Sequence, residues 1–186
     1  MNVRLVLTAV LVVIVAALAW YFRWPIINSI RPHHPPTPLV AGQNLPRITA
    51  MPVGASNAQA IGPAPGHFLL INVFATWCGP CRSETPSLRK LSDETAGKLL
   101  QIVGIDQHES DDAVIQFSHV YGLTYPMYVS RDSMTASILG VHYIPVTIIV
   151  DPAGVVRANV IGPMTYDQMR VLVQRVVGPR AFRVNG

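Results

Sequence analysis

Residues 74–82 read Phe74-Ala75-Thr76-Trp77-Cys78-Gly79-Pro80-Cys81-Arg82, and they hold both cysteines of the 186-residue chain. A near-continuous apolar run, Phe68 to Phe74, precedes the pair, and a helical pattern from Pro80 to about Ala96 follows it. The cysteines are therefore expected at a strand-to-helix junction. Two residues between cysteines on the first turn of a helix bring the sulfurs within disulfide reach. The stretch predicts a pair that cycles between dithiol and disulfide.

The two cysteines are expected to have different roles, because the chemistry needs a thiolate. A free cysteine with a pKa of about 8.5 is roughly 3% ionised at pH 7, and a pKa of about 7 at a helix N-terminus raises that to about half. Cys78, exposed beside Trp77, is the expected nucleophile, and Cys81, one turn into the helix, the resolving thiol. Gly79 has no Cβ to obstruct a partner chain, and Pro80 suits a first helical turn.

Other uses of a cysteine pair fit this sequence less well. Zinc would need a second pair of ligands, and the chain has two cysteines in all. A copper-binding assembly factor would combine the pair with a histidine such as His142 or His119, but Gly-Pro between the cysteines suits redox cycling better. A static disulfide would not require the tip of a strand-helix junction beside an exposed tryptophan. We expect no metal and no cofactor.

The remaining pattern predicts an α/β domain with the order βαβαβαββα, and hence a mixed sheet with helices on both faces. Besides a possible short strand at 47–51, the expected strands are 68–74, 99–105, 127–129, 146–150 and 155–161. The expected helices are 80–96, with a kink at Pro86, and 111–121, 133–139 and 166–177.

Three features together resemble the thioredoxin superfamily: the stretch 74–82, Pro86, and Gly-Val-His-Tyr-Ile-Pro-Val-Thr at 140–147 before the strand and turn 148–154. The chain is similar to its membrane-anchored TlpA/DsbE-like branch, which includes the cytochrome c maturation reductases. The resemblance covers roughly residues 40–177. It implies a thioredoxin-like fold with Pro145 as a cis-proline beside the cysteines, and with Trp77, Ile144 and Pro145 binding an extended substrate segment.

The sequence departs from that family at two places. Thioredoxins carry a buried acid six residues before the first cysteine, where this chain has Asn72. Many maturation reductases carry a glutamate soon after the cis-proline, where Val146 and Thr147 stand. Glu84, one turn beyond Cys81, is a candidate substitute acid or base, although an exposed helical glutamate is the simpler interpretation.

The N-terminal part predicts a membrane anchor, residues 1–24, and a linker, residues 25–39, ahead of a domain at 40–186. Residues 5–22 carry no charge, and a helix of that length spans roughly 27 Å, close to the hydrocarbon thickness of a bilayer. Ala17-Leu18-Ala19 leaves open a cleaved signal peptide instead. Four prolines in residues 31–38 predict a polyproline-like spacer, in which His33 and His34 are expected to be solvated rather than metal ligands.

The net charge of +4 comes mostly from residues 1–31, which hold three arginines and no acidic residue. Residues 32–186 carry eleven basic and ten acidic side chains, and this near balance argues against binding of nucleic acid. The expected protein is a single-pass protein of the bacterial cytoplasmic membrane, with its catalytic domain on the extracytoplasmic side. It is expected to reduce protein disulfides with electrons from a membrane donor, and cytochrome c maturation is one plausible pathway. The alternatives are a thiol oxidase or isomerase, or a copper-binding assembly factor.

Overall fold

The computed structural model describes residues 3–29, 37–131 and 134–182, and the chain divides into two compact units, residues 1–35 and 36–186. In the first unit, helix α1 (Val3–Ser29) includes the predicted span 5–22 and continues past the predicted boundary at residue 24. The side chains of residues 6–21 in this helix are largely apolar and exposed.

No helix among the described residues is both long and apolar enough to cross a membrane. Residues 5–22, which we expected to be helical, lie within α1. Residues 31–36 of the predicted spacer, with His33 and His34, lie outside the described residues.

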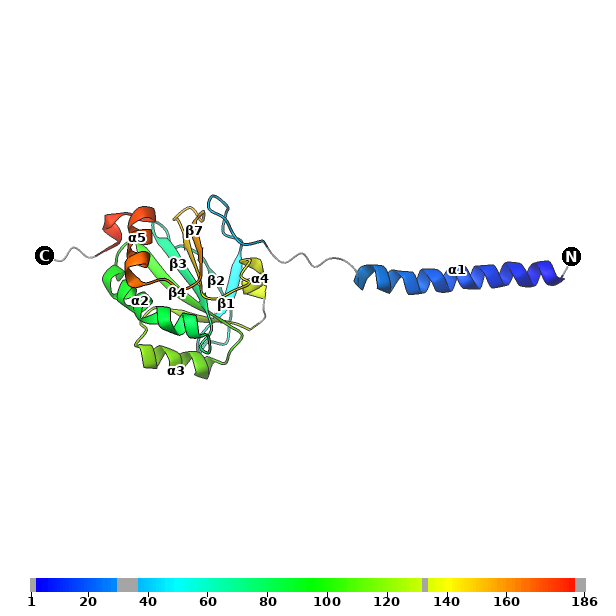
Figure 1. Cartoon of the computed structure of the whole chain (residues 1–186), viewed down its shortest axis with the longest axis horizontal. Helices are drawn as coiled ribbons and strands as arrows, with labels where there is room; N and C mark the ends of the chain where they lie inside the picture. The colour runs from blue at the N-terminus through cyan, green and yellow to red at the C-terminus, as the bar shows by residue number, and fades with distance from the viewer. Residues whose placement is uncertain (1–2, 30–36, 132–133, 183–186) are drawn as a thin grey trace. The chain divides into compact units, whose positions relative to one another are not determined.

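The second unit is built on a mixed seven-stranded sheet with the order β2-β1-β5-β4-β3-β6-β7 (Figure 1). Strands β3, β4 and β5 run parallel to one another, and the remaining pairs are antiparallel. The strands are β1 (Ile48–Pro52), β2 (Gln59–Ile61), β3 (Phe68–Phe74), β4 (Leu100–Gln107), β5 (Met127–Ser130), β6 (Val146–Val150) and β7 (Val156–Ile161). The mixed sheet that we predicted is confirmed, and β2 is a strand that we did not predict.

Helices follow the strands at the predicted places: α2 (Gly79–Thr95), α3 (Asp111–Tyr121), α4 (Met134–Ile138) and α5 (Tyr166–Val176), with a short 3₁₀ turn at Pro179–Ala181. Their ends have clear local causes. Ser110 caps α3 at its start and Gly122, in the left-handed region, ends it. Thr165 and Gln168 form a capping box at the start of α5.

Two apolar layers enclose the central strands. On one face, side chains such as Leu70 and Ile149 pack with Leu88 of α2 and Met169 of α5. On the other, a layer that includes Ile71 and Ile148 packs with Leu139, which follows α4, and with the partly buried Leu39 and Leu45. Because β3 is central and covered on both faces, the turn that leaves its C-terminal end is rigidly placed.

Candidate functional site

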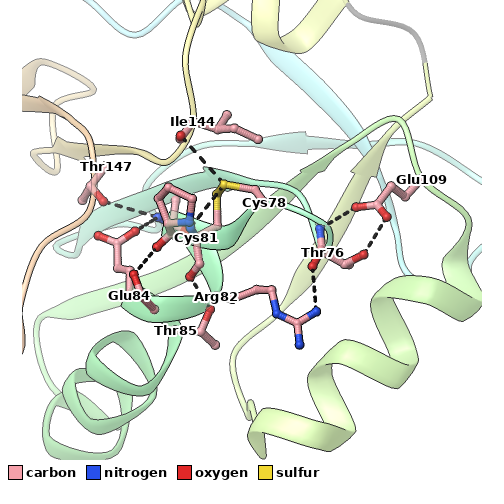
Figure 2. The surroundings of a disulfide bond; sticks show 12 residues. Thr76, Cys78, Cys81, Arg82, Glu84, Thr85, Glu109, Ile144 and Thr147 are labelled. Atoms are coloured by element: carbon pink, nitrogen blue, oxygen red, sulfur yellow. Dashed lines mark hydrogen bonds between the residues drawn. A yellow bond between two sulfur atoms is a disulfide. The ribbon is translucent and has the colours of Figure 1, made fainter.

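The cysteine pair lies where β3 ends and α2 begins, as predicted. Cys78 caps the helix, and its Sγ accepts a hydrogen bond from the Cys81 backbone N–H at 3.2 Å. The two residues form a disulfide with a Cα–Cα distance of 5.2 Å (Figure 2). Pro80 occupies the first turn, and a Cβ built on Gly79 would meet no atom within 4 Å. The first turn of α2 is therefore open at Gly79, and its amides favour negative charge on Cys78.

The loop before β6 covers the pair. The Ile144–Pro145 peptide bond is cis, as the resemblance implied. The Ile144 carbonyl oxygen lies 3.9 Å from Cys78 Sγ, and Gly162 N–H donates to the Pro145 carbonyl at 2.8 Å. This loop explains why Cys78, which we expected to be exposed, is only 5% exposed in the disulfide form, whereas Trp77 beside it is 71% exposed.

Glu84 lies on the buried face of α2, one turn beyond Cys81, and is 1% exposed, so the simpler interpretation of an exposed glutamate is wrong. Its Oε1 accepts from Met164 N–H at 3.1 Å, and its Oε2 accepts from Asn72 Nδ2 at 3.3 Å. Burial raises the pKa of Glu84 to about 7, against the lowering effect of these two hydrogen bonds. The side chain can therefore gain or lose a proton near neutral pH.

A second acidic group supports the turn ahead of Cys78 and was not predicted. The Glu109 carboxylate accepts from Thr76 N–H and from the Thr76 hydroxyl, both at 2.6 Å. Glu109 N–H in turn donates to Asp106 Oδ1 at 2.9 Å. On the other side, Arg82 donates to the Thr76 carbonyl at 3.5 Å (Figure 2). These contacts fix the Thr76 backbone from both sides.

The two carboxyls of this group have opposite pKa shifts. Burial, followed by the hydrogen bond with Glu109, raises the pKa of Asp106 to about 8. Burial would also raise the pKa of Glu109, but hydrogen bonds from Asp106 and Thr76 outweigh it and hold that pKa below its ordinary value. At neutral pH the pair therefore holds one proton, on Asp106, and Glu109 is the anion that binds Thr76.

The order of the strands could have indicated that Asp106 and Glu109 lie near Thr76. Asp106 lies opposite Phe74 in the parallel pair β3–β4, so the segments that follow the two strands meet at one edge of the sheet. His142 is exposed, and among the residues described no cluster of three or more histidine, cysteine or acidic side chains is placed to hold a metal. The structure thus brings together Cys78, Cys81, Ile144 and Pro145, with Glu84 and Asn72 behind them.

The chain matches known proteins over this domain. Residues 42–159 match the model of the AhpC/TSA family. Thioredoxin-like protein YneN of Bacillus subtilis is 32% identical over 131 residues, which cover 69% of this chain and 75% of that protein. Thiol-disulfide oxidoreductase ResA of Bacillus thuringiensis is 29% identical over 111 residues, covering 60% of this chain and 64% of ResA, which is less than two thirds of its length.

A solved structure gives the same picture of the fold. A secreted thiol-disulfide isomerase from Corynebacterium glutamicum is 26% identical and superposes with a TM-score of 0.63, covering 74% of this chain and 84% of that chain. The architecture around the cysteine pair is thus thioredoxin-like.

Proposed function

The chain belongs to the AhpC/TSA family, and from that premise we propose that it is a thiol-disulfide oxidoreductase that reduces protein disulfides. One observation carries the proposal: the Cys78–Cys81 disulfide stands at the start of α2 against the cis Ile144–Pro145 bond. A pair in this setting can open and close without moving the sheet. The names of the relatives, thiol-disulfide oxidoreductase and thioredoxin-like protein, support the same activity.

The reaction is a two-electron exchange in two steps. In the reduced protein, Cys78 thiolate attacks one sulfur of a substrate disulfide, the substrate S–S bond breaks, and the other substrate sulfur leaves as a thiolate that takes a proton from water. Cys81 then loses its proton, and its thiolate attacks Cys78 Sγ and breaks the mixed disulfide. The second substrate sulfur leaves as a thiolate that also takes a proton from water. The substrate gains two electrons and two protons, and the protein is left with the disulfide seen here.

The surrounding residues have separate tasks in this proposal. Glu84, as carboxylate, takes the Cys81 proton, because it is the buried group one helical turn away that can hold a proton near neutral pH. Trp77 and the Ile144 backbone bind the substrate segment beside Cys78, with Pro145 shaping the loop. A dithiol donor of another protein must restore the reduced state, and we place that donor in the membrane.

A protein-disulfide reduction assay tests the proposal. Wild type, Cys78→Ala and Cys81→Ala are compared with a protein disulfide as substrate and a chemical dithiol as donor. We expect Cys78→Ala to lose the activity and Cys81→Ala to accumulate a mixed disulfide with the substrate. Parental rates from Cys78→Ala would disprove the mechanism. Because the resemblance extends to cytochrome c maturation, a peptide with an oxidised Cys-x-x-Cys-His segment is the first specific substrate to test.

The direction of electron flow is part of the proposal and has its own test. The Gly79-Pro80 pair favours a reductant, so we expect a reduction potential nearer the value of about −270 mV typical of thioredoxin than the value of about −120 mV of a strong oxidant. Equilibration with glutathione measures it. A potential near the oxidising value would favour a thiol oxidase or isomerase.

We also propose that the domain works outside the cytoplasm, tethered by residues 5–22. The support is the uncharged run itself, the exposed apolar side chains of α1 and the secreted relative from Corynebacterium glutamicum. Labelling of the reduced cysteines in intact cells with impermeant and permeant thiol reagents tests the side of the membrane. Carbonate extraction tests the attachment, and release of the chain into the soluble fraction would refute it.

A further inference from the structure

Asn72 and Thr147 form a buried polar pair across two strands. They lie directly opposite each other in the antiparallel register of β3 and β6, two residues along from the apolar pair Leu70 and Ile149. Residues two apart on a strand share a face, so the polar pair faces α2 and α5. Both residues are buried. Polar groups in such a place destabilise the fold unless hydrogen bonds satisfy them.

The hydrogen bonds of this pair converge on Glu84. An asparagine amide has two N–H donors. The Asn72 amide uses one toward Glu84 Oε2 at 3.3 Å and the other toward Thr147 Oγ1 at 3.4 Å. Because Thr147 accepts one N–H, it fixes the rotation of the amide, and the second N–H is left directed at the carboxylate.

We propose that Asn72 and Thr147 are positioning residues for Glu84: the Thr147 hydroxyl oxygen orients the Asn72 amide, and the amide holds the ionised carboxylate one turn from Cys81. The inference rests on the proposed function, in which Glu84 takes the Cys81 proton. A neutral donor next to Glu84 favours its ionised form, whereas a second carboxylate there would oppose it.

Few other charges act on this carboxyl. Of the described residues, Tyr125, just ahead of β5, is a titratable group whose pKa responds to the charge on Glu84. Cys81 lies one turn away on the same helix. Burial, and then the charge on Glu84, raise the pKa of Tyr125, so it stays neutral in the range of interest. In the oxidised protein Cys81 has no proton to titrate. A titration of the oxidised chain therefore reports Glu84 itself.

The test uses the full chain and the paired variants Thr147→Val and Thr147→Ser. Valine keeps the shape and removes the acceptor, and serine keeps the acceptor. The chain has three glutamates, Glu84, Glu94 and Glu109, so carboxyl ¹³C NMR of glutamate-labelled oxidised protein yields at most three signals, and Glu84→Gln identifies one of them. The second readout is the pH dependence of the step that releases the reduced substrate.

We expect Thr147→Val to raise the midpoint of the Glu84 titration by roughly one pH unit, because the ionised form loses an oriented donor. Its release step should slow several-fold at pH 7 and recover at pH 9. Thr147→Ser should match wild type. Asn72→Ala removes the amide altogether and should shift the midpoint at least as far. Thr95→Val is the control. The Thr95 hydroxyl is buried on α2, the helix of Glu84, and donates to the Leu91 carbonyl at 2.9 Å, so the variant also removes a buried threonine hydroxyl.

The outcomes separate this inference from the proposed function. An unchanged Glu84 midpoint in both Thr147→Val and Asn72→Ala overturns the inference, whatever the activity. A shift of equal size in Thr95→Val also overturns it, since the effect would then be a general loss of packing. If the wild type reduces no protein disulfide, the proposed function fails. The NMR titration still decides whether Asn72 and Thr147 stabilise the ionised form of Glu84.

Discussion

Glu84 makes the stability of the domain depend on pH in a direction opposite to that of most acidic residues. Its pKa of about 7 in the fold lies above the ordinary 4.5, so folding favours the protonated form. The stabilisation is complete below pH 4.5 and is lost as the pH rises through 7. Glu84→Gln should therefore increase the free energy of unfolding at pH 8 by about 1–3 kcal/mol and leave it nearly unchanged at pH 4.

Urea unfolding of the oxidised protein at several pH values measures this effect. Asp93→Asn, at an exposed position of the same helix that pairs with Arg89, controls for the loss of one negative charge. A glutamine variant that is less stable than wild type at pH 8 would show that the carboxylate gains more from its two hydrogen bonds than burial removes.

Gly140 tests a close backbone contact that the sequence did not indicate. Its φ is +66°, and a Cβ there would lie 2.3 Å from the Thr37 carbonyl oxygen and 2.7 Å from Pro38 Cα. Gly140→Ala should lower the free energy of unfolding by about 2–4 kcal/mol, because backbone atoms cannot move aside. Gly97→Ala is the matched control: its φ is +71° with no atom within 4 Å, so it carries the conformational strain alone. If thermal unfolding shows that Gly140→Ala and Gly97→Ala lose equal stability, the close contact of Gly140 with Thr37 and Pro38 is contradicted.

At the scale of elements, two junctions at the same sheet edge support each other. The turn from β3 to α2 carries Thr76, and the turn from β4 to α3 carries Glu109, which binds it twice. Glu109→Gln leaves one acceptor oxygen in place of two and removes the charge. We expect faster amide exchange at Thr76 and a loss of about 1–2 kcal/mol in the free energy of unfolding. Hydrogen exchange measured residue by residue checks it, and Thr95→Val, remote from this turn, should not change exchange at Thr76.

How far the elements could be predicted depended on the kind of signal each one carries. The bounds of β3, β6 and α3 match the predicted ones, because an apolar run or a capped periodic pattern sets their ends. Strand β2 was missed, since its three residues, Gln-Ala-Ile, gain strand structure only by pairing with β1. Burial of Glu84 was missed for a similar reason. Local pattern places it on a charged helix, and only the docking of α2 against β3 and the segment at Met164 decides its surroundings.

For the whole molecule, the N-terminal residues of the domain protect an open sheet edge. Residues 42–45 pair with residues 154–156, in the turn before β7 and at its first residue. Gly42 N–H donates to the Val156 carbonyl, Val156 N–H to the Gln43 carbonyl and Leu45 N–H to the Gly154 carbonyl, each at 2.8 Å. Asn159 adds a hydrogen bond from its side chain to the Leu39 carbonyl at 2.7 Å. Uncovered edges of this kind are prone to pairing with other chains.

This arrangement predicts different behaviour for two truncated chains. A chain of residues 36–186 contains the whole second unit and should unfold in one transition and reduce protein disulfides like the full chain. A chain of residues 46–186 keeps every strand of the sheet and the whole cysteine site, but it loses the segment that pairs at the start of β7, and it should unfold at least 5 °C lower and self-associate. Thermal unfolding and light scattering compare the two. Equal melting temperatures would mean that residues 39–45 do not stabilise the edge they contact. The contact of Gly140 with Thr37 and Pro38, which the shorter chain also lacks, would then not stabilise the fold either.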